Sequence, residues 1–466
     1  MDFMDSNDEQ SNILEKVEKF ENMLTSSGNE YFDREDFQEL IDYYLSINEQ
    51  DRANTVLSYA FEQHPNSSDL LIAKTHVLIA NDQYKEALET IIEIETTQPQ
   101  NGEVLMAKGT IYSRLKMSEK AINCFKKSLK LAEFKEDVYF LIAMEHQHNM
   151  DYEKAIQYHT YALRENSLFE LSLYETNVCF DCLGKYEKAI AFYNDFLNLN
   201  PYSETAWFNL GAMYAKIDDY KNAVNAYDYA LAINPYFSSA LFNKGNALAS
   251  DDRYEEAILT YKETFEHESP SYVTYCYIGE CHERLKRYNK ALKYYNKAIK
   301  EDDTYADAWL GKAIALDHLG HPLDAYRNIK HAIELNDSEP DYWYTAAELE
   351  EKLGLTQESI KSMQTAVSLD KSDLNLTVNY IQLIARNLDF KATSEVIDEA
   401  MDTFPNNESL MVMKAGYAFK NNLTEVGCQF LGQALSINPK VYKFLFEHFP
   451  ECKTNQYALE LIDQNS

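Results

Sequence analysis

The strongest constraint on the fold is an internal period of 34 residues, which runs along the chain without an insertion or a deletion. Units that start at residue 34 and every 34 residues onward to residue 408 give twelve repeats over 34–441. The twentieth residue of the unit is small in all twelve repeats, and it is Ala in the first nine, from Ala53 to Ala325. A repeat of this length is one supersecondary unit, which buries its apolar face by stacking on its neighbours.

Other positions of the unit predict two helices joined by a tight turn. Position 27 is Ala in eight repeats, and small residues at positions 20 and 27 allow paired helices to approach closely. Six of the ten prolines fall at position 32, where a proline ends the second helix. Gly184, Gly320 and Gly354 share position 15, where a left-handed residue would close the first helix. Position 24 is bulky in most repeats, as in Leu57, Phe125, Tyr193, Tyr227, Tyr261, Tyr295 and Ile329.

The sixth repeat shows how these features combine. It reads Ala206-Trp207-Phe208-Asn209-Leu210-Gly211-Ala212-Met213-Tyr214, followed by Ala223, Tyr227, Ala230 and Pro235. This pattern resembles the tetratricopeptide repeat, and the array resembles bacterial-type cytoplasmic repeat proteins of that family without a catalytic domain. The resemblance implies an all-α fold: a right-handed α-solenoid, or superhelix, of tandem helix–turn–helix repeats with helical caps.

Two segments outside the array are expected to seal its ends, because a solenoid end must not expose its stacking face. Residues 1–33 are predicted to hold a disordered tail up to residue 10 and an N-terminal capping helix over 11–24. Residues 442–466 are predicted to form C-terminal capping helices. The array and its caps leave no segment for a separate catalytic domain, so we expect neither an enzyme nor a cofactor.

The composition narrows the class of partner. The chain has 43 Lys or Arg and 76 Asp or Glu, and the net charge of −33 disfavours nucleic acid and anionic membranes, which are polyanions. No apolar run reaches the roughly 18 residues that span a membrane, so we expect no membrane insertion. Seven cysteines with irregular spacing and an acidic N-terminus without a secretory leader predict a cytoplasmic protein with reduced thiols.

Motifs that carry chemistry are few. Cys179 and Cys182 form a CxxC pair, but the helical array lacks the βαβ context of a redox motif. No second pair stands nearby to complete a zinc site, so we interpret these cysteines as incidental and predict no metal. His159 occupies the bulky position 24 and is predicted to be a satisfied core residue.

In the family, the first helix of each repeat lines a concave groove, and the resemblance implies that positions 2, 5, 9, 12 and 13 face the ligand. Position 5 carries four consecutive aromatic residues, Phe140, Tyr174, Phe208 and Phe242, and the tenth repeat adds Tyr344. One interpretation is a platform for the apolar anchors of a peptide. The other is packing between neighbouring first helices, which would make these side chains half buried and structural.

Three asparagines lie on the same helices, Asn209 and Asn243 at position 6 and Asn246 at position 9. In superhelical members of the family, an asparagine ladder at position 6 holds the backbone of a bound peptide, which suits an amide that both donates and accepts. The alternative is that they are polar surface amides. The Lys and Asn clamp that holds the tails of heat-shock chaperones is absent, so we do not expect a C-terminal carboxylate as ligand.

Acidic residues collect on groove positions of repeats eight to ten, namely Glu280, Glu283, Asp307, Asp317, Asp341, Glu348 and Glu351. They would recognise Lys- or Arg-rich segments through steering and specificity. The alternative is a solvated face of a very acidic protein, because position 13 places basic residues beside the acids.

These observations favour a non-enzymatic scaffold or adaptor that binds apolar or basic peptide segments in its groove. Two alternatives stay open: a regulatory subunit of an enzyme complex, and a chaperone-like holdase for unfolded clients. The ends of the solenoid could also mediate self-association.

Overall fold

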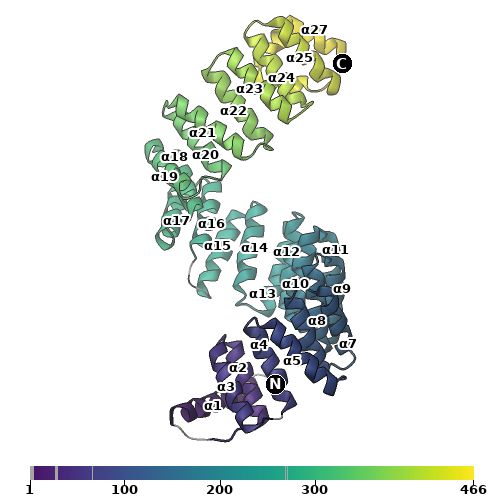
Figure 1. Ribbon diagram of the computed structural model, residues 1–466. Helices are drawn as coiled ribbons and strands as arrows, with labels where there is room; N and C mark the ends of the chain where they lie inside the picture. Colours follow the sequence, from purple (N-terminus) through teal and green to yellow (C-terminus); the bar gives the residue numbers. More distant parts are fainter. Residues whose placement is uncertain (1–4, 27–29, 66, 268, 270, 466) are drawn as a thin grey trace. The chain divides into compact units, whose positions relative to one another are not determined.

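The computed structural model describes residues 5–26, 30–65, 67–267, 269 and 271–465. The chain divides into two compact units, Met1–Ala240 and Leu241–Ser466, and each is described by itself. Within the described residues every regular element is a helix, and no strand is present. The fold is therefore an all-α solenoid of tandem helices, as the sequence predicts (Figure 1).

The helices of the first unit are α1 (Asp5–Ser26), α2 (Arg34–Ser46), α3 (Gln50–Gln63), α4 (Ser68–Ala80), α5 (Tyr84–Thr97), α6 (Gly102–Arg114), α7 (Ser118–Ser128), α8 (Lys135–His148), α9 (Tyr152–Glu165), α10 (Glu170–Leu183), α11 (Tyr186–Leu199), α12 (Glu204–Lys216) and α13 (Tyr220–Ile233). The unit boundary falls inside α14 (Ser238–Ser250).

The second unit continues with α15 (Tyr254–Glu263), the 3-10 helix η1 (Thr264–Glu266), α16 (Tyr272–Arg284), α17 (Tyr288–Glu301), α18 (Ala306–His318), α19 (Pro322–Leu335), α20 (Pro340–Lys352), α21 (Thr356–Leu369), α22 (Leu374–Asn387), α23 (Phe390–Thr403), α24 (Glu408–Lys420), α25 (Thr424–Ile437), α26 (Tyr442–His448), the 3-10 helix η2 (Pro450–Thr454) and α27 (Gln456–Asn465).

The helix boundaries follow the period of 34 residues. First helices begin at the first residue of the unit or one residue before it, and second helices begin sixteen residues after that first residue. Short polar residues cap many of the first helices at position 34: the side chain of Ser67 accepts from the amide of Leu70, and that of Asn407 accepts from the amide of Leu410. These bonds satisfy backbone donors that the helix itself leaves open.

The turn between the two helices of a repeat closes as position 15 predicts. Gly184, Gly320 and Gly354 all have positive φ, which confirms their predicted left-handed conformation. In eight other repeats a residue with a side chain takes the same conformation at this position, namely Asn48, Asp82, Lys116, Met150, Asp218, Asp252, Lys286 and Asn422. Repeat eleven differs: Leu388 is extended at φ −126°, and the next residue, Asp389, caps α23 with its side chain.

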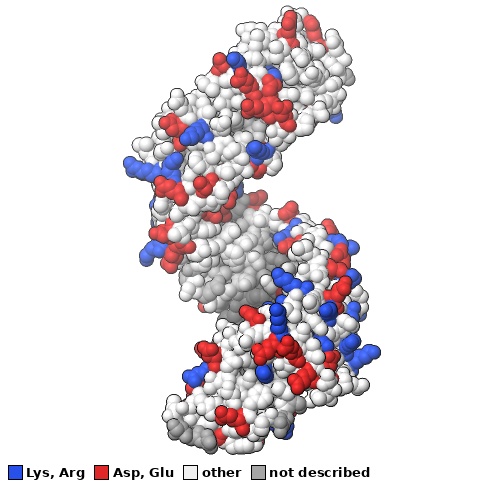
Figure 2. Space-filling view, in the orientation of Figure 1, with Lys and Arg blue, Asp and Glu red and all other residues white. Residues whose placement is uncertain are grey.

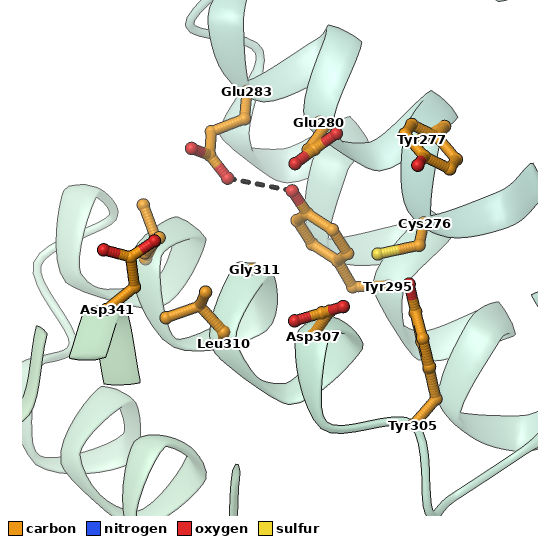
Figure 3. Close-up of a pocket in the computed structure, with 11 residues that line it drawn as sticks. Cys276, Tyr277, Glu280, Glu283, Tyr295, Tyr305, Asp307, Leu310, Gly311 and Asp341 are labelled. Carbon is orange, nitrogen blue, oxygen red and sulfur yellow. Dashed lines mark hydrogen bonds between the residues drawn. The ribbon is translucent and has the colours of Figure 1, made fainter. Parts of the chain in front are cut away.

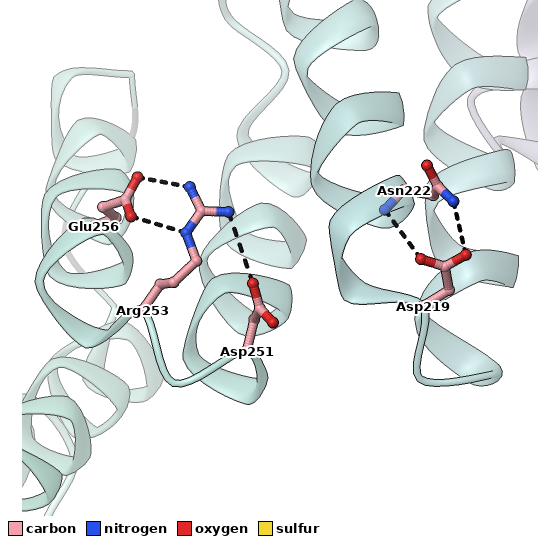
Figure 4. Close-up of polar contacts among 5 residues, drawn as sticks. All are labelled: Asp219, Asn222, Asp251, Arg253 and Glu256. Carbon is pink, nitrogen blue, oxygen red and sulfur yellow. Dashed lines mark hydrogen bonds and ion pairs between the residues drawn. The ribbon is translucent and has the colours of Figure 1, made fainter.

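Position 16 caps the second helix in different ways (Figure 4). In the first unit, Asp219 accepts from the backbone amide of Asn222 at 3.3 Å and from its side-chain amide at 2.7 Å. In the second unit the same position holds Arg253, which cannot accept. Its guanidinium instead donates twice to Glu256, at 2.8 and 2.7 Å, and lies 3.8 Å from Asp251.

The core of each repeat is built on the ring at position 24. Tyr227 is 2% exposed, and a Cβ added to Gly211 at position 8 would lie 2.6 Å from its ring, so the close approach requires glycine. His159 is fully buried at position 24, and its ring nitrogens lie 3.2 Å from Ser172 Oγ and 3.2 Å from Gln147 Oε1. The prediction of a satisfied core histidine is therefore confirmed.

Helices cover both ends of the array. The N-terminal helix α1 begins at Asp5, earlier than residue 11 where the sequence predicts its start; the stretch before residue 11 is rich in Asp and Glu, which favour a helix N-terminus. Phe20 of α1 is buried and contacts Phe32 edge-on, with ring centroids 5.9 Å apart. At the other end, Leu445 of α26 and Ile462 of α27 are buried in one cluster with residues of α24 and α25. Residues 1–4 of the predicted disordered tail lie outside the described residues.

Candidate functional site

The position-5 aromatics are placed differently from one another. In the first unit, the half-buried ring of Phe140 lies 5.6 Å from His159 and 5.6 Å from Phe169. Phe208 is half buried too, 5.9 Å from Tyr227 and 5.0 Å from Phe237. Each of these two half-buried side chains therefore contacts neighbouring rings of the array.

Tyr174 of the first unit is 61% exposed, so it alone among the four consecutive aromatics offers most of its surface to a partner. In the second unit, the half-buried Phe242 packs at 5.7 Å from Tyr261 and 5.4 Å from Tyr277. Tyr344 is half buried, and its hydroxyl donates to Glu348 at 2.9 Å. The position-5 rings therefore differ in how much of their surface a partner could reach.

Two of the three asparagines make hydrogen bonds inside the array. Asn209 is 3% exposed, and its side-chain amide donates to the carbonyl of Leu173 in the preceding repeat at 3.2 Å. Asn246 accepts from the hydroxyl of Tyr261 at 2.6 Å. Asn243 is half buried on α14. The side-chain amides of Asn209 and Asn246 are thus already hydrogen-bonded within the chain, so they have fewer donors and acceptors left for the backbone of a bound peptide.

Part of the acidic set is compensated by neighbouring cations. Asp317 forms an ion pair with Lys352, and Glu351 lies 3.3 Å from Arg386. Such exposed pairs contribute little to stability, but they lower the attraction of these acids for a ligand. Over the face shown in Figure 2, acidic and basic side chains likewise lie close together.

Glu280 and Glu283 are different, because they line a cavity of about 250 Å³ (Figure 3). Both come from α16, at positions 9 and 12, and three residues apart they lie on one face of that helix. Asp307 at the start of α18 and Asp341 at the start of α20 also line it. We call this space, between α16 and α18, the acidic cavity.

The walls of the acidic cavity are aromatic and apolar. Tyr295 of α17 is fully buried, and its hydroxyl donates to Glu283 at 2.9 Å. A Cβ on Gly311 of α18 would lie 2.2 Å from this ring, so the glycine allows the two helices to meet around it. Leu310 and Ile314, from the same helix, complete the apolar wall.

No Lys, Arg or His lines the acidic cavity, and its four carboxylates take part in no ion pair within the described part of the chain. Desolvation raises the pKa of Glu280, which the charge of Arg284 partly opposes. Desolvation also raises the pKa of Glu283, against the hydrogen bond from Tyr295. Asp307 accepts from the hydroxyl of Tyr342 at 2.5 Å. A cation in this cavity would relieve the cost of keeping Glu280 and Glu283 charged.

The sequence points to all four carboxylates of this cavity, Glu280, Glu283, Asp307 and Asp341. It does not point to Tyr295, Leu310 or Gly311 as parts of a site. One signal was present: Gly311 is the only glycine at position 6 in the twelve repeats. A glycine at a position that elsewhere carries a side chain marks a close approach or an opening.

The cysteines are all free thiols. Cys179 is buried, and desolvation raises its pKa to about 12, so it is a poor nucleophile. Among the described residues, no group of three His, Cys, Asp or Glu is placed to hold a metal ion. In the same residues no helix is long and apolar enough to cross a membrane.

Two family models, both described as the tetratricopeptide repeat, match the chain. One matches residues 205–237 and 272–305, and the other matches 102–134 and 340–373. All four stretches begin within one residue of a unit start in the period of 34. A search of the curated proteins found no match to this sequence.

Several solved structures match this chain with TM-scores below 0.5. The APC/C hetero-tetramer Cut9–Hcn1 matches with a TM-score of 0.42 and 13% identity, over 87% of this chain and 93% of that chain. YrrB, a TPR protein with an unusual peptide-binding site, matches with 0.32 and 16%, over 41% and 97%. TTC0263, a thermophilic TPR protein of Thermus thermophilus, matches with 0.35 and 22%, over 39% and 99%.

Proposed function

This chain is a tandem tetratricopeptide-repeat protein, and from that premise we propose that it is a non-catalytic scaffold that binds a basic segment of a partner protein at the acidic cavity. Repeats of this family bind proteins and peptides, which supports the general role. The observation that carries the specific proposal is the cavity itself, where four carboxylates without a cation lie beside an apolar wall.

A Lys or Arg side chain suits both parts of this surface. Its aliphatic stem would pack on Leu310 and Ile314, while its charged head would reach the carboxylates of Glu280 and Glu283. The ring of Tyr277, which also lines the cavity, adds an aromatic face for the cation. Because desolvation raises the pKa of Glu280 and of Glu283, binding of a cation beside these two side chains would release protons in mildly acidic buffer.

The test uses the full chain and a fluorescent Lys-rich peptide, with a Gln-for-Lys peptide as the neutral probe. The variant Glu280→Gln with Glu283→Gln keeps the shape of both side chains and removes their charges. We expect its affinity for the Lys-rich peptide to be about tenfold lower than that of the wild type, which corresponds to about 1.4 kcal/mol. The wild-type affinity should fall as salt is added, and the affinity of the variant should fall less.

The matched control is Asp317→Asn with Glu351→Gln, which removes two charges that Lys352 and Arg386 already compensate. Its affinity is expected to stay close to that of the wild type. Equal losses in both variants would mean that the net charge of the chain attracts the peptide, and the proposal would be wrong. Tight binding of the neutral peptide would contradict it as well.

A further inference from the structure

The most basic stretch of this acidic chain is repeat three, residues 102–135. It holds eight Lys or Arg and three Glu, a net charge of +5, whereas the whole chain carries −33. The repeats before and after it each carry −4. The positive charge is therefore local, and screening over about 8 Å at physiological salt keeps it local.

Two of these cations line a cavity of about 760 Å³ between α6 and α8. Arg114 is the last residue of α6. Lys116, two residues later, is the left-handed residue of the turn, with φ 59°. His148, the last residue of α8, lines the same cavity. Ser118 begins α7, so the positive end of that helix dipole lies at the wall. We call this space the basic pocket.

Arg114 and Lys116 are exposed and take part in no ion pair within the described residues, whereas Lys108 of the same repeat is paired with Glu95 at 2.5 Å. The pocket contains one acid, Glu145, which is 2% exposed and lies 3.7 Å from His148. The two free cations thus outweigh the single buried carboxylate.

We infer that the basic pocket binds an acidic side chain, a carboxylate or a phosphate, from a segment of a partner protein. The guanidinium of Arg114 offers paired donors that match two oxygens of such a group. Lys116 adds a point charge beside it, and the hydroxyl of Ser113 adds a neutral donor. This inference does not rest on the proposed function, because the pocket shares no residue with the acidic cavity.

A peptide is favoured over nucleic acid by the charges around the pocket. A polyanion would extend beyond repeat three onto neighbours that are strongly acidic, whereas one anionic side chain is confined to the pocket. Thr110, Ser113 and Arg114 also occupy positions 9, 12 and 13, which the repeat pattern predicts to face a peptide.

The experiment measures anisotropy of three matched fluorescent peptides that differ at one residue: phosphoserine, Glu or Gln. They are titrated with the full chain, with Arg114→Gln plus Lys116→Gln, and with Lys127→Gln plus Lys130→Gln. The last variant removes two charges from the same repeat at residues that do not line the pocket. Far-ultraviolet circular dichroism checks that all three proteins are folded.

We expect the wild type to bind the phosphoserine or Glu peptide about tenfold more tightly than the Gln peptide. The relative affinity of the two acidic peptides then identifies phosphate or carboxylate as the preferred source. The pocket variant should lose that preference, while the control variant should change it by less than about twofold. Equal losses in both variants, or wild-type binding that does not distinguish acidic from neutral peptides, would overturn the inference.

Discussion

The acidic cavity of the second unit and the basic pocket of the first occupy corresponding positions of the repeat. Both spaces are lined by positions 9, 12 and 24 of one repeat and by positions 6 and 9 of the repeat that follows it. Positions 9 and 12 are Glu280 and Glu283 in the acidic cavity, but Thr110 and Ser113 in the basic pocket. The repeat supplies the space in both places, and a few side chains at fixed positions decide which charge it attracts.

Both spaces share a structural frame, which we define as the buried ring at position 24 and the glycine at position 8 that packs against it. Phe125 at the basic pocket is 1% exposed, and Tyr295 at the acidic cavity is fully buried. A Cβ on Gly109 would lie 2.4 Å from the first ring, and a Cβ on Gly279 would lie 2.8 Å from the second. The ring and its glycine therefore belong to the fold, whereas the exposed positions around them are free to specialise.

The largest effect is expected where this frame is broken. Phe125→Ala and Tyr295→Ala each remove a buried ring and should each lower the free energy of unfolding by about 3–5 kcal/mol. The measurement is urea unfolding followed by circular dichroism. Tyr295→Phe is the control: it keeps the ring, loses only the hydrogen bond to Glu283, and should cost about 1 kcal/mol. A Phe variant as unstable as the Ala variant would show that the hydroxyl, not the ring, supports the frame.

The frame could be predicted from the sequence because each position is sampled twelve times. The left-handed turn at Gly184 and the buried ring at Tyr227 follow from residue types that recur at a fixed period. Repeat eleven shows the limit: Leu388 stands at position 15, where the left-handed conformation is costly, and the chain takes an extended turn capped by Asp389 instead. Because this extended turn occurs in one repeat alone among those described, no recurring residue type could predict it from the sequence.

The site could be predicted less well, because the direction of a side chain depends on contacts one repeat away. Phe208 and Tyr174 share position 5, yet they differ in exposure. The ring of Phe208 contacts that of Phe237, which lies between α13 and α14, whereas Tyr174 is exposed. Asn209 likewise donates to a carbonyl in the preceding repeat, which its own repeat does not reveal. Net charge counted for each repeat separately would have indicated the basic pocket from the sequence.

A second prediction contrasts two buried histidines, one in each unit. Burial lowers the pKa of both His159 and His282 to about 4. The unfolded chain takes up protons on these rings below about pH 6.5 while the folded chain does not, so stability is lost as the pH falls from 6.5 toward 4. Each ring should contribute a loss of up to about 3 kcal/mol at pH 4. Urea unfolding at a series of pH values measures it.

Replacing each histidine by Phe should have different effects on stability at pH 7. Nδ1 of His282 is buried without a hydrogen-bond partner in the described residues, so His282→Phe should cost little at pH 7 and remove its share of the acid loss. His159→Phe also removes its share, but it leaves Ser172 and Gln147 without their partner and should cost about 1–3 kcal/mol at pH 7. An unchanged pH profile in both variants would assign the acid sensitivity to other groups.

A third prediction transfers charge from one region to the other. Thr110→Glu with Ser113→Glu places in the basic pocket the residues that positions 9 and 12 carry in the acidic cavity. If these positions decide the preference, affinity for the phosphoserine peptide should fall about tenfold. Thr110→Gln with Ser113→Gln tests whether size alone is responsible. A comparable loss in the Gln variant would mean that the new side chains block the pocket.

The smallest effect is expected at position 15, which carries Met150 in the first unit and Lys286 in the second. Both adopt the left-handed conformation, at φ 58° and 56°, which costs a residue with a side chain about 1–2 kcal/mol. Glycine removes that cost but loses more conformational freedom on folding, so Met150→Gly and Lys286→Gly should each stabilise the chain by about 0.5–1 kcal/mol. Gly184→Ala is the reverse experiment: nothing lies within 4 Å of the added Cβ, so its loss of stability measures the backbone cost alone. A stabilised Gly184→Ala variant would contradict the argument, because the same frame at position 15 must favour glycine in both units.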